Sequence, residues 1–296
     1  MLLDRMPSLP LLLARILLRR KAPYQGQPLP PGRVRVEGIR INPAHLERYR
    51  RLIQCVEGDA GVPLCYPHLL SFPLQLSLIT VPAFPLPLLG LVHLRNRIRA
   101  YRAINPHAPV QLESWLQGQN PTERGLEFEL CTRLEQGGER VWESCSVNLY
   151  RSRTAPRAAR VADRLSPLGC RGRWELPANL GRRYARLAGD YNPIHLFGLS
   201  ARLFGFPRAL IHGMWSKARC ITSLQDAVAE LGEALEVSCE FKTPLFLPGE
   251  ALMSWQVGSE GGVDFLLQDG AGVRPHLKGV MRALNPGVGA IAEGAS

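Results

Sequence analysis

The feature that most constrains the fold is an order of predicted elements that occurs twice along the 296 residues. In each half, a predicted strand leads to a helix and then to a break where Asp follows Gly, at Gly58-Asp59 and Gly189-Asp190. A second helix and a series of strand-like stretches come next, several of which alternate apolar and polar residues, as half-buried antiparallel strands do. The repeated plan predicts a degenerate duplication of one α+β unit, although the two halves differ in sequence.

The expected elements can be placed on the chain. The first half predicts a helix from Pro43 to about Cys55 and an apolar helix within Pro67–Thr80. Its strand-like stretches are RVRVEG, GLVHLRNRI, VQLESWLQG, GLEFELCTRL and RVWESCSVNLY. The second half predicts a helix over Leu180–Ala188 and another after Gly213. Its strand-like stretches are GRWELP, ALEVSCEFKT, EALMSWQVG, VDFLLQD and VRPHLKGVMRAL.

A long uncharged stretch, residues 61–94, raises the question of a membrane span, because it holds no Asp, Glu, Lys or Arg. A span needs about 20 uninterrupted apolar residues. Six prolines divide the stretch, at Pro63, Pro67, Pro73, Pro82, Pro85 and Pro87. It is therefore expected to be a buried core segment with irregular turns, and no transmembrane segment is predicted.

The N-terminus resembles a signal sequence only at first sight. Asp4 and Pro7 stand where a basic region is expected, Arg15 interrupts the apolar run, and no small-residue cleavage site follows. An amphipathic helix over about Pro10–Lys21 is expected instead. It would lie on the body of the protein or, as an alternative, on an anionic membrane surface.

The charge balance favours an anionic partner. The formal net charge is +11 and the pI is about 9.7, which suits a phosphorylated ligand, an acidic carrier protein, an anionic membrane or a nucleic acid. The basic residues are scattered, with no stripe interleaved with aromatic residues, so a nucleic-acid partner is not expected. Six arginines lie in the connector RSRTAPRAARVADRLSPLGCRG, which predicts a solvated linker or, as an alternative, phosphate contacts by Arg153, Arg157, Arg160 and Arg164.

The seven cysteines include no CxxC pair, which argues against a disulfide framework and against a zinc ribbon. Reduced and mostly buried thiols in a cytoplasmic protein are the simpler expectation. No group of His, Cys and carboxylate residues has the spacing of metal ligands along the chain, so no metal site is predicted.

The segment that carries chemistry is YARLAGDYNPIHLFGLSARLFGFPRALIHGM, residues 184–214. The predicted helix stops at Gly189, and Asn192-Pro193 forces a turn, so Asp190 and His195 can converge on one point. An Asp and a His that converge in a pocket can hold and polarise one water molecule. The alternative is purely structural: Asp190 would make an Asx turn and His212 would be a satisfied core histidine.

Gly213 is expected at or near the start of the next helix. Backbone N–H groups there point outward with partial positive charge, and Gly lets a ligand approach closely. Such a donor can stabilise a carbonyl oxygen that becomes enolate-like. Together with an activated water, it is the minimum needed to add water to an α,β-unsaturated carbonyl compound, or to remove it.

GDYNPIH, followed by GFPRALIHGM, closely resembles the hydratase motif of the MaoC-like family of (R)-specific enoyl-CoA hydratases and 3-hydroxyacyl-thioester dehydratases. SCEFKTPLFLPGE resembles a later strand, turn and Gly-acidic segment of that family, and the match covers about Arg173–Leu284. The resemblance implies an α+β hot dog fold, in which a curved antiparallel sheet wraps a long central helix. Because the plan is duplicated, we expect a double hot dog. We expect four segments: a 1–30 amphipathic extension, a 31–152 degenerate hot dog, a 153–171 Arg/Pro-rich linker and a 172–296 catalytic hot dog.

By position, the resemblance makes Asp190 and His195 a catalytic dyad and Gly213 the donor to the thioester carbonyl. The remaining candidate substrate-binding residues are Tyr191, Asn192, His212 and Ser216. The first half departs from the motif, since Leu64 stands five residues after Asp59 and Leu69 follows His68 where Gly would be required. It is therefore expected to be a pseudo-site that completes the sheet and could make room for a long acyl chain.

The implied function is that of a cytoplasmic lyase that reversibly hydrates trans-2-enoyl-CoA to (R)-3-hydroxyacyl thioesters in fatty acid or polyketide metabolism. The resemblance implies no metal or redox cofactor, because CoA or the phosphopantetheine of a carrier protein is part of the substrate. Three alternatives stay open: a dehydratase acting on carrier-bound chains, a non-catalytic module that binds acyl thioesters, and thioester hydrolysis on the same fold. Double hot dogs can also pair further into a homodimer.

Overall fold

The computed structural model describes residues 1–18, 24–55, 61–88, 90–151, 165–258 and 261–284. The first half supplies β2 (Arg33–Ile39), α2 (Pro43–Ile53), α3 (Tyr66–Ile79), β3 (Val92–Ala100), β4 (Val110–Thr122), β5 (Gly125–Gln136) and β6 (Glu139–Arg151). The second half supplies β7 (Cys170–Leu176), α4 (Leu180–Ala188), α6 (Gly213–Thr222), β8 (Leu235–Phe241), β9 (Gly249–Val257), β10 (Val263–Asp269) and β11 (Pro275–Ala283). Further elements are β1 (Leu2–Leu3), α1 (Leu9–Leu18), the 3-10 helix η1 (Pro193–His195), α5 (Gly198–Leu203) and α7 (Gln225–Leu231). The duplicated order of elements is confirmed, while β1, α5 and α7 have no counterpart among the predicted elements.

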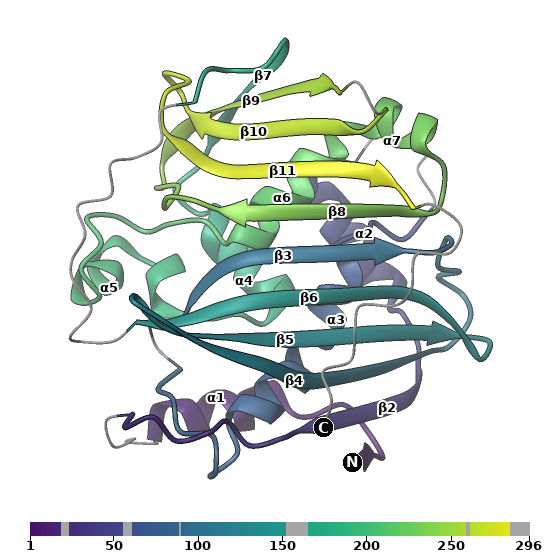
Figure 1. Cartoon of the computed structure of the whole chain (residues 1–296), viewed down its shortest axis with the longest axis vertical. Helices are drawn as coiled ribbons and strands as arrows, with labels where there is room; N and C mark the ends of the chain where they lie inside the picture. Colours follow the sequence, from purple (N-terminus) through teal and green to yellow (C-terminus); the bar gives the residue numbers. More distant parts are fainter. Residues whose placement is uncertain (19–23, 56–60, 89, 152–164, 259–260, 285–296) are drawn as a thin grey trace.

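One sheet of eleven described strands runs through both halves, in the order β1-β2-β4-β5-β6-β3-β8-β11-β10-β9-β7 (Figure 1). Strands β3 and β8 pair antiparallel at its centre, where Ile98 lies opposite Val237. Outward from this seam the order is β6-β5-β4-β2 on one side and β11-β10-β9-β7 on the other. Apart from β1, which lies beyond β2 at one edge, each strand of one half thus has a counterpart at the same place in the other half, as a duplication requires.

The helices α3 and α6 lie against the same face of this sheet (Figure 1). Ten of the fourteen residues of α3 and seven of the ten residues of α6 are buried, so both helices are enclosed on nearly all sides. Each half therefore has a buried helix wrapped by an antiparallel sheet, and the α+β double hot dog is confirmed. The described part of the uncharged stretch forms α3, irregular turns that bury Phe84 and Leu86, and the first residues of β3.

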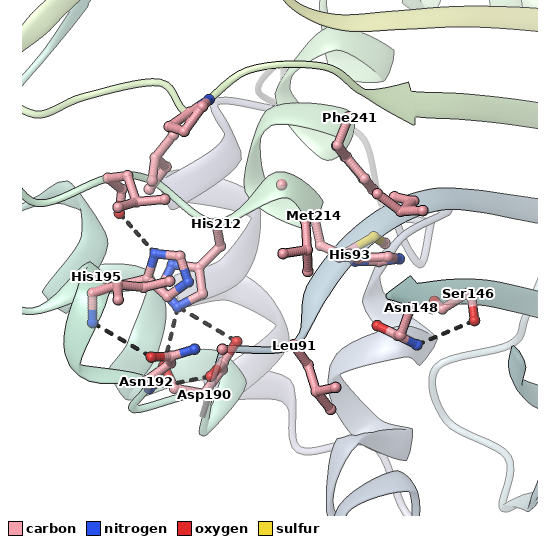
Figure 2. Close-up of a pocket in the computed structure, with 18 of the residues that line it drawn as sticks. Leu91, His93, Ser146, Asn148, Asp190, Asn192, His195, His212, Met214 and Phe241 are labelled. Carbon is pink, nitrogen blue, oxygen red and sulfur yellow. Dashed lines mark hydrogen bonds and ion pairs between the residues drawn. The ribbon is translucent and has the colours of Figure 1, made fainter. Parts of the chain in front are cut away.

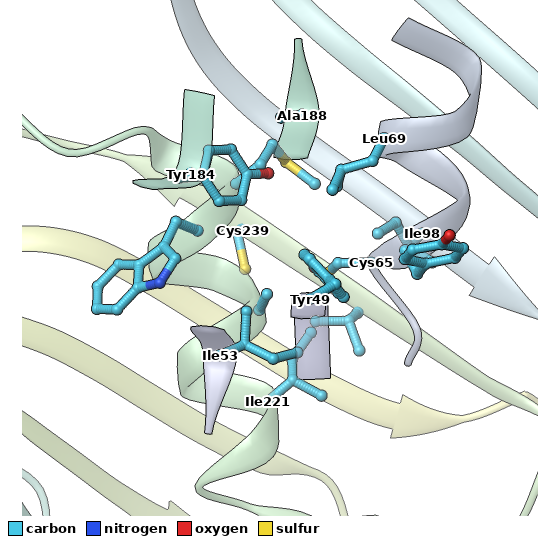
Figure 3. Packing of buried hydrophobic residues seen from close by; sticks show 14 of the residues in the cluster. Tyr49, Ile53, Cys65, Leu69, Ile98, Tyr184, Ala188, Ile221 and Cys239 are labelled. Atoms are coloured by element: carbon cyan, nitrogen blue, oxygen red, sulfur yellow. The ribbon is translucent and has the colours of Figure 1, made fainter. Parts of the chain in front are cut away.

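The two halves share one hydrophobic core (Figure 3). Tyr49 of α2, Ile98 of β3, Tyr184 of α4 and Cys239 of β8 belong to a single cluster of buried side chains. All four are at most 3% exposed. Helix α2 contacts α4 and α6, and α3 contacts α4, so helices of the two halves pack against one another.

A buried cation also joins the halves at the seam. Lys217 of α6 is fully buried, and its Nζ donates to the Asn96 Oδ1 at 2.6 Å, the Asn96 carbonyl at 3.1 Å and the Val237 carbonyl at 2.9 Å. Burial lowers the pKa of Lys217, because the charged form loses its hydration. Three acceptors fill the hydrogen-bonding capacity of the ammonium group. They fix α6 against β3 and β8.

The N-terminal helix lies on the body of the protein, as expected. Leu9 of α1 packs against the backbone of Gly189, where a Cβ would stand 2.5 Å from the Leu9 Cδ1. The helix ends at Leu18 in the described residues, and the rest of the predicted range to Lys21 lies outside them. The described residues contain no helix that is both long and apolar enough to cross a membrane.

The expectation of reduced thiols is wrong for one pair. Cys131 and Cys145 lie directly opposite each other on β5 and β6 and form a disulfide. The thiols of Cys65, Cys170, Cys220 and Cys239 are free. The sequence does not reveal the pair, because their proximity depends on the register between two strands. The segment boundaries stay predictions: Gly58-Asp59 and residues 153–164 of the linker lie outside the described residues, and β7 begins at Cys170, inside the expected linker.

Candidate active site

The loop after α4 carries the candidate dyad. Helix α4 ends at Ala188, and Gly189 caps it with a φ of 75°, a left-handed conformation that favours Gly. The Asp190 Oδ1 accepts a hydrogen bond from the Asn192 N–H at 3.2 Å, so the structural interpretation as an Asx turn is also correct. The Asp190 side chain is nevertheless 34% exposed, and the residue lines a cavity.

The rings of His195 and His212 meet beside this carboxyl group (Figure 2). The His195 Nδ1 lies 2.8 Å from the Leu210 carbonyl oxygen, and the His212 Nε2 lies 3.0 Å from the Asp190 carbonyl oxygen and 3.8 Å from its Oδ2. The ring centroids are 3.7 Å apart. A carbonyl oxygen can only accept, so the tautomers follow from these bonds: Nδ1–H in His195 and Nε2–H in His212.

Both rings are neutral near pH 7. Burial lowers the pKa of His195, although the nearby Asp190 and the bond to Leu210 act in the opposite direction. Burial and the neighbouring His195 ring hold the pKa of His212 well below its ordinary value. With Nδ1–H bonded to a carbonyl group, His195 keeps its Nε2 lone pair available as a proton acceptor.

Gly213 is the first residue of α6 and lines the same cavity. The N–H groups of a first helical turn have no acceptor within the helix and carry partial positive charge. A Cβ at this position would lie 2.8 Å from the Phe241 ring. Gly is therefore the residue that fits here without displacing the ring. At the start of α6, the backbone of Gly213 therefore faces the cavity without a side chain between it and a ligand.

The cavity has a volume of about 800 Å³ and is lined by both halves and by α1. Its first-half wall is mostly apolar and includes Leu69, Phe72, Leu76, Ile79, Leu91 and Leu130. Leu13 and Ile16 of α1 complete it. The expectation that the first half makes room in the pocket therefore agrees with the shape of the cavity.

Two further histidines, His68 and His93, line the first-half side of the cavity. Their rings lie parallel with centroids 6.4 Å apart, and the His93 ring packs on Phe241 at 4.7 Å. Burial lowers the pKa of His68 to about 4 and that of His93 to about 3. His93 was not among the candidate residues, because only the pairing of β3 with β8 brings it to Phe241 and the site.

All seven candidate residues line the cavity: Tyr191, Asn192, Asp190, His195, His212, Gly213 and Ser216. His212 differs from the expectation in one respect. Its side chain is only 4% exposed and bonds to the main chain of Asp190, so its ring contacts the dyad more than it faces open space.

The same fold creates a cluster that the spacing along the chain does not reveal. Asp190, His195 and His212 each offer a ligand atom within 4.8 Å of the others, a distance at which they could hold a metal ion. One nitrogen of each ring is already bonded to a main-chain carbonyl group. The expectation that no metal is needed stays a prediction.

Comparison with known proteins agrees with the motif. Residues 175–264 match the family model of the MaoC like domain. The 3-hydroxyacyl-thioester dehydratase X of Mycobacterium tuberculosis is 32% identical over 260 residues, which cover 86% of this chain and 91% of that protein. The crystal structure of HtdX from the same organism matches 86% of this chain and 100% of its own, at 31% identity with a TM-score of 0.74. A peroxisomal enoyl-CoA hydratase 2 of Arabidopsis thaliana is 39% identical over 72 residues, 23% of each protein. The chain therefore belongs to the MaoC-like family of dehydratases.

Proposed function

We propose that this chain is a hydro-lyase that adds water reversibly to trans-2-enoyl thioesters and yields (R)-3-hydroxyacyl thioesters. One observation carries the proposal: the Asp190 carboxyl group and the His195 ring converge on a largely apolar cavity that also receives the start of α6 at Gly213. The names of the relatives, a 3-hydroxyacyl-thioester dehydratase and an enoyl-CoA hydratase, agree with it.

The thioester carbonyl oxygen would accept a hydrogen bond from the Gly213 N–H. When water adds to C3, negative charge moves onto this oxygen, and the positive end of α6 stabilises the enolate-like state. Because a side chain at residue 213 would collide with the Phe241 ring, only Gly leaves this position open to the thioester.

The water would lie between the Asp190 carboxylate and the unprotonated Nε2 of His195. As its oxygen bonds to C3, the dyad takes its proton, and a proton is delivered to C2 on the same face. The net change is OH at C3 and H at C2, and dehydration follows the same path in reverse. Tyr191, Asn192 and Ser216 would contact the substrate from the cavity wall.

The acyl chain would extend along the apolar wall that the first half and α1 provide. CoA, or the phosphopantetheine of a carrier protein, would remain attached as part of the substrate, and no metal or redox cofactor takes part in the proposed steps. We place the reaction in fatty acid or polyketide metabolism in the cytoplasm, with a homodimer as the proposed assembly and no nucleic-acid partner.

The test is hydration of crotonyl-CoA and trans-2-octenoyl-CoA, followed by the loss of enoyl absorbance. We expect Asp190→Asn and His195→Gln each to lower kcat by about 10² to 10⁴-fold, the range that one general acid–base group supplies. Asp226→Asn, on the exposed part of α7, and His107→Gln are matched controls that should leave kcat unchanged.

Three other outcomes would contradict the proposed reaction or the roles of its residues. Release of free thiol without hydration would indicate thioester hydrolysis. Tight binding of acyl-CoA with no turnover would indicate a non-catalytic binding module. Activity that survives both dyad variants would contradict the assignment of Asp190 and His195.

A further inference from the structure

The segment that contains α5 exposes an unusual number of apolar side chains. In the part of the chain that the structure describes, eleven large hydrophobic residues are exposed, and five of them lie between residues 191 and 204. Leu199 and Leu203 are 76% and 82% exposed, the two highest values in that group. Isolated exposed Leu residues are ordinary, but a cluster indicates a contact surface.

The longer stretch that surrounds this segment, residues 180–210, is basic. Residues 180–210 contain five arginines and one Asp, with no Lys or Glu, which gives a formal charge of +4. In contrast to most arginines of the first half, none of the five has a carboxylate within 4.0 Å among the described residues. Arg182 stacks on the exposed Phe197 ring at 4.8 Å, so a basic and an apolar residue share one surface.

This surface also lies at the cavity. Phe204 and Phe206 line the cavity, whereas Leu199, Arg202 and Leu203 do not. The Ser200 Oγ donates to the Pro193 carbonyl at 2.7 Å and so ties α5 to η1, which carries His195. Figure 1 shows α5 at the edge of the molecule, outside the sheet. We call the set Arg182, Phe197, Leu199, Arg202, Leu203, Phe204 and Arg208 the α5 rim.

We infer that the α5 rim is a docking surface for an acidic acyl carrier protein, which presents the thioester to the cavity beneath it. The inference rests on the proposed hydratase function and names the protein that delivers its substrate. Carboxylates of the carrier would pair with Arg202 and Arg208, and its apolar side chains would cover Leu199 and Leu203. Charge complementarity of this kind guides the encounter and sets the orientation of the partner.

Two other occupants fit the α5 rim less well. A second copy related by a twofold axis would place the same patch against itself, and the arginines of both copies would then face each other. The nucleotide of CoA would use the arginines but would leave Leu199 and Leu203 uncovered. An acidic protein can both pair with the arginines of the α5 rim and cover its exposed apolar side chains.

The experiment compares one acyl group on two carriers. The trans-2-octenoyl group is offered on CoA and on a bacterial acyl carrier protein, to the parent and to Leu203→Asp and Arg202→Glu. For these variants we expect kcat/KM with the carrier ester to fall about tenfold, mainly through KM, and to stay within about twofold with the CoA ester. Val257→Asp and Arg40→Glu are matched controls, because both residues are exposed and Figure 1 places the ends of β9 and β2 on the side away from α5.

A second measurement does not depend on catalysis. Signals of an isotope-labelled carrier protein without phosphopantetheine should broaden when the parent is added, and less so with Leu203→Asp. If the parent hydrates neither ester while this broadening persists, the proposed function fails and the docking surface stands.

Four results would overturn the docking surface. Two concern activity: the variants lose kcat/KM equally with both esters, or they lose it with neither. The other two concern a different occupant: the variants lose dimerisation, or binding to phosphatidylglycerol vesicles, while kcat/KM with the carrier ester is unchanged.

Discussion

The imidazole rings of His195 and His212 stack with their centroids 3.7 Å apart and their planes inclined by 27°. The His212 Nε2–H also donates to the Asp190 carbonyl oxygen at 3.0 Å. One ring thus touches both members of the proposed dyad. Because its pKa is held well below the ordinary value, His212 packs against His195 as a neutral group and adds no positive charge there.

His212 is therefore expected to act as a positioning residue. His212→Leu should lower kcat by about 10 to 100-fold with little change in KM, because small displacements of reacting groups are costly. It should also shift the acidic limb of the pH profile, since the surroundings of His195 change. A thermal melt serves as the control for folding. Unchanged kcat and an unchanged pH profile in a folded variant would rule out this role.

The packing of Gly213 against Phe241 makes a second prediction. Gly213→Ala places a Cβ 2.8 Å from the Phe241 ring, so either the ring or the start of α6 must move. We expect kcat/KM to fall about 100-fold, the range reported for loss of one oxyanion donor. Gly213→Ala combined with Phe241→Leu should recover part of the activity, since the N–H is kept and the collision is relieved. Full activity of Gly213→Ala alone would contradict the role given to this backbone group.

The local part of the site could be predicted from the sequence because its geometry is encoded within a few residues. Gly189 ends α4, and Asn192-Pro193 turns the chain, so the backbone near Asp190 and His195 lets their side chains converge. The start of α6 could also be predicted locally, because helix-compatible sequence follows Gly213, whereas the need for Gly there comes from Phe241 on a distant strand.

The remaining wall of the site depends on contacts between distant segments. His93 reaches Phe241 only through the register of β3 and β8. Leu9 reaches Gly189 only because α1 folds back onto the body of the protein. The Cys131–Cys145 disulfide likewise needs the β5–β6 register. No pattern within one segment specifies such pairings, which explains why the sequence left them open.

His68 and His93 predict how stability depends on pH. Burial lowers the pKa of His68 to about 4 and that of His93 to about 3, whereas the ordinary value is about 6.5. Below pH 6.5 the unfolded chain binds a proton at each ring and the folded chain does not. Stability is therefore full above this pH and falls as pH decreases, by about 1.4 kcal/mol per pH unit for each ring.

Urea unfolding between about pH 4.5 and 6.5 checks this prediction, because most carboxyl groups stay ionised in that range. The double variant His68→Gln, His93→Gln should lose a large part of the pH dependence. His107→Gln, in a surface loop, is the control and should retain it. If the double variant kept the full slope, the acid sensitivity would lie elsewhere, with His195 and His212 as the next candidates.

Phe72 of α3 should control which acyl chains are accepted, because its half-buried ring lines the first-half side of the cavity, on an element separate from the dyad loop. Phe72→Ala enlarges the cavity and should raise kcat/KM for trans-2-dodecenoyl-CoA relative to crotonyl-CoA. Phe72→Trp should lower the same ratio. We expect a change of about 10-fold if one or two methylene groups of the acyl chain no longer fit in the cavity. Crotonyl-CoA is the internal control, since its short chain stays near the dyad. Equal changes for both substrates would mean that the ring affects folding or the dyad, and an unchanged ratio in both variants would place the acyl chain along another wall.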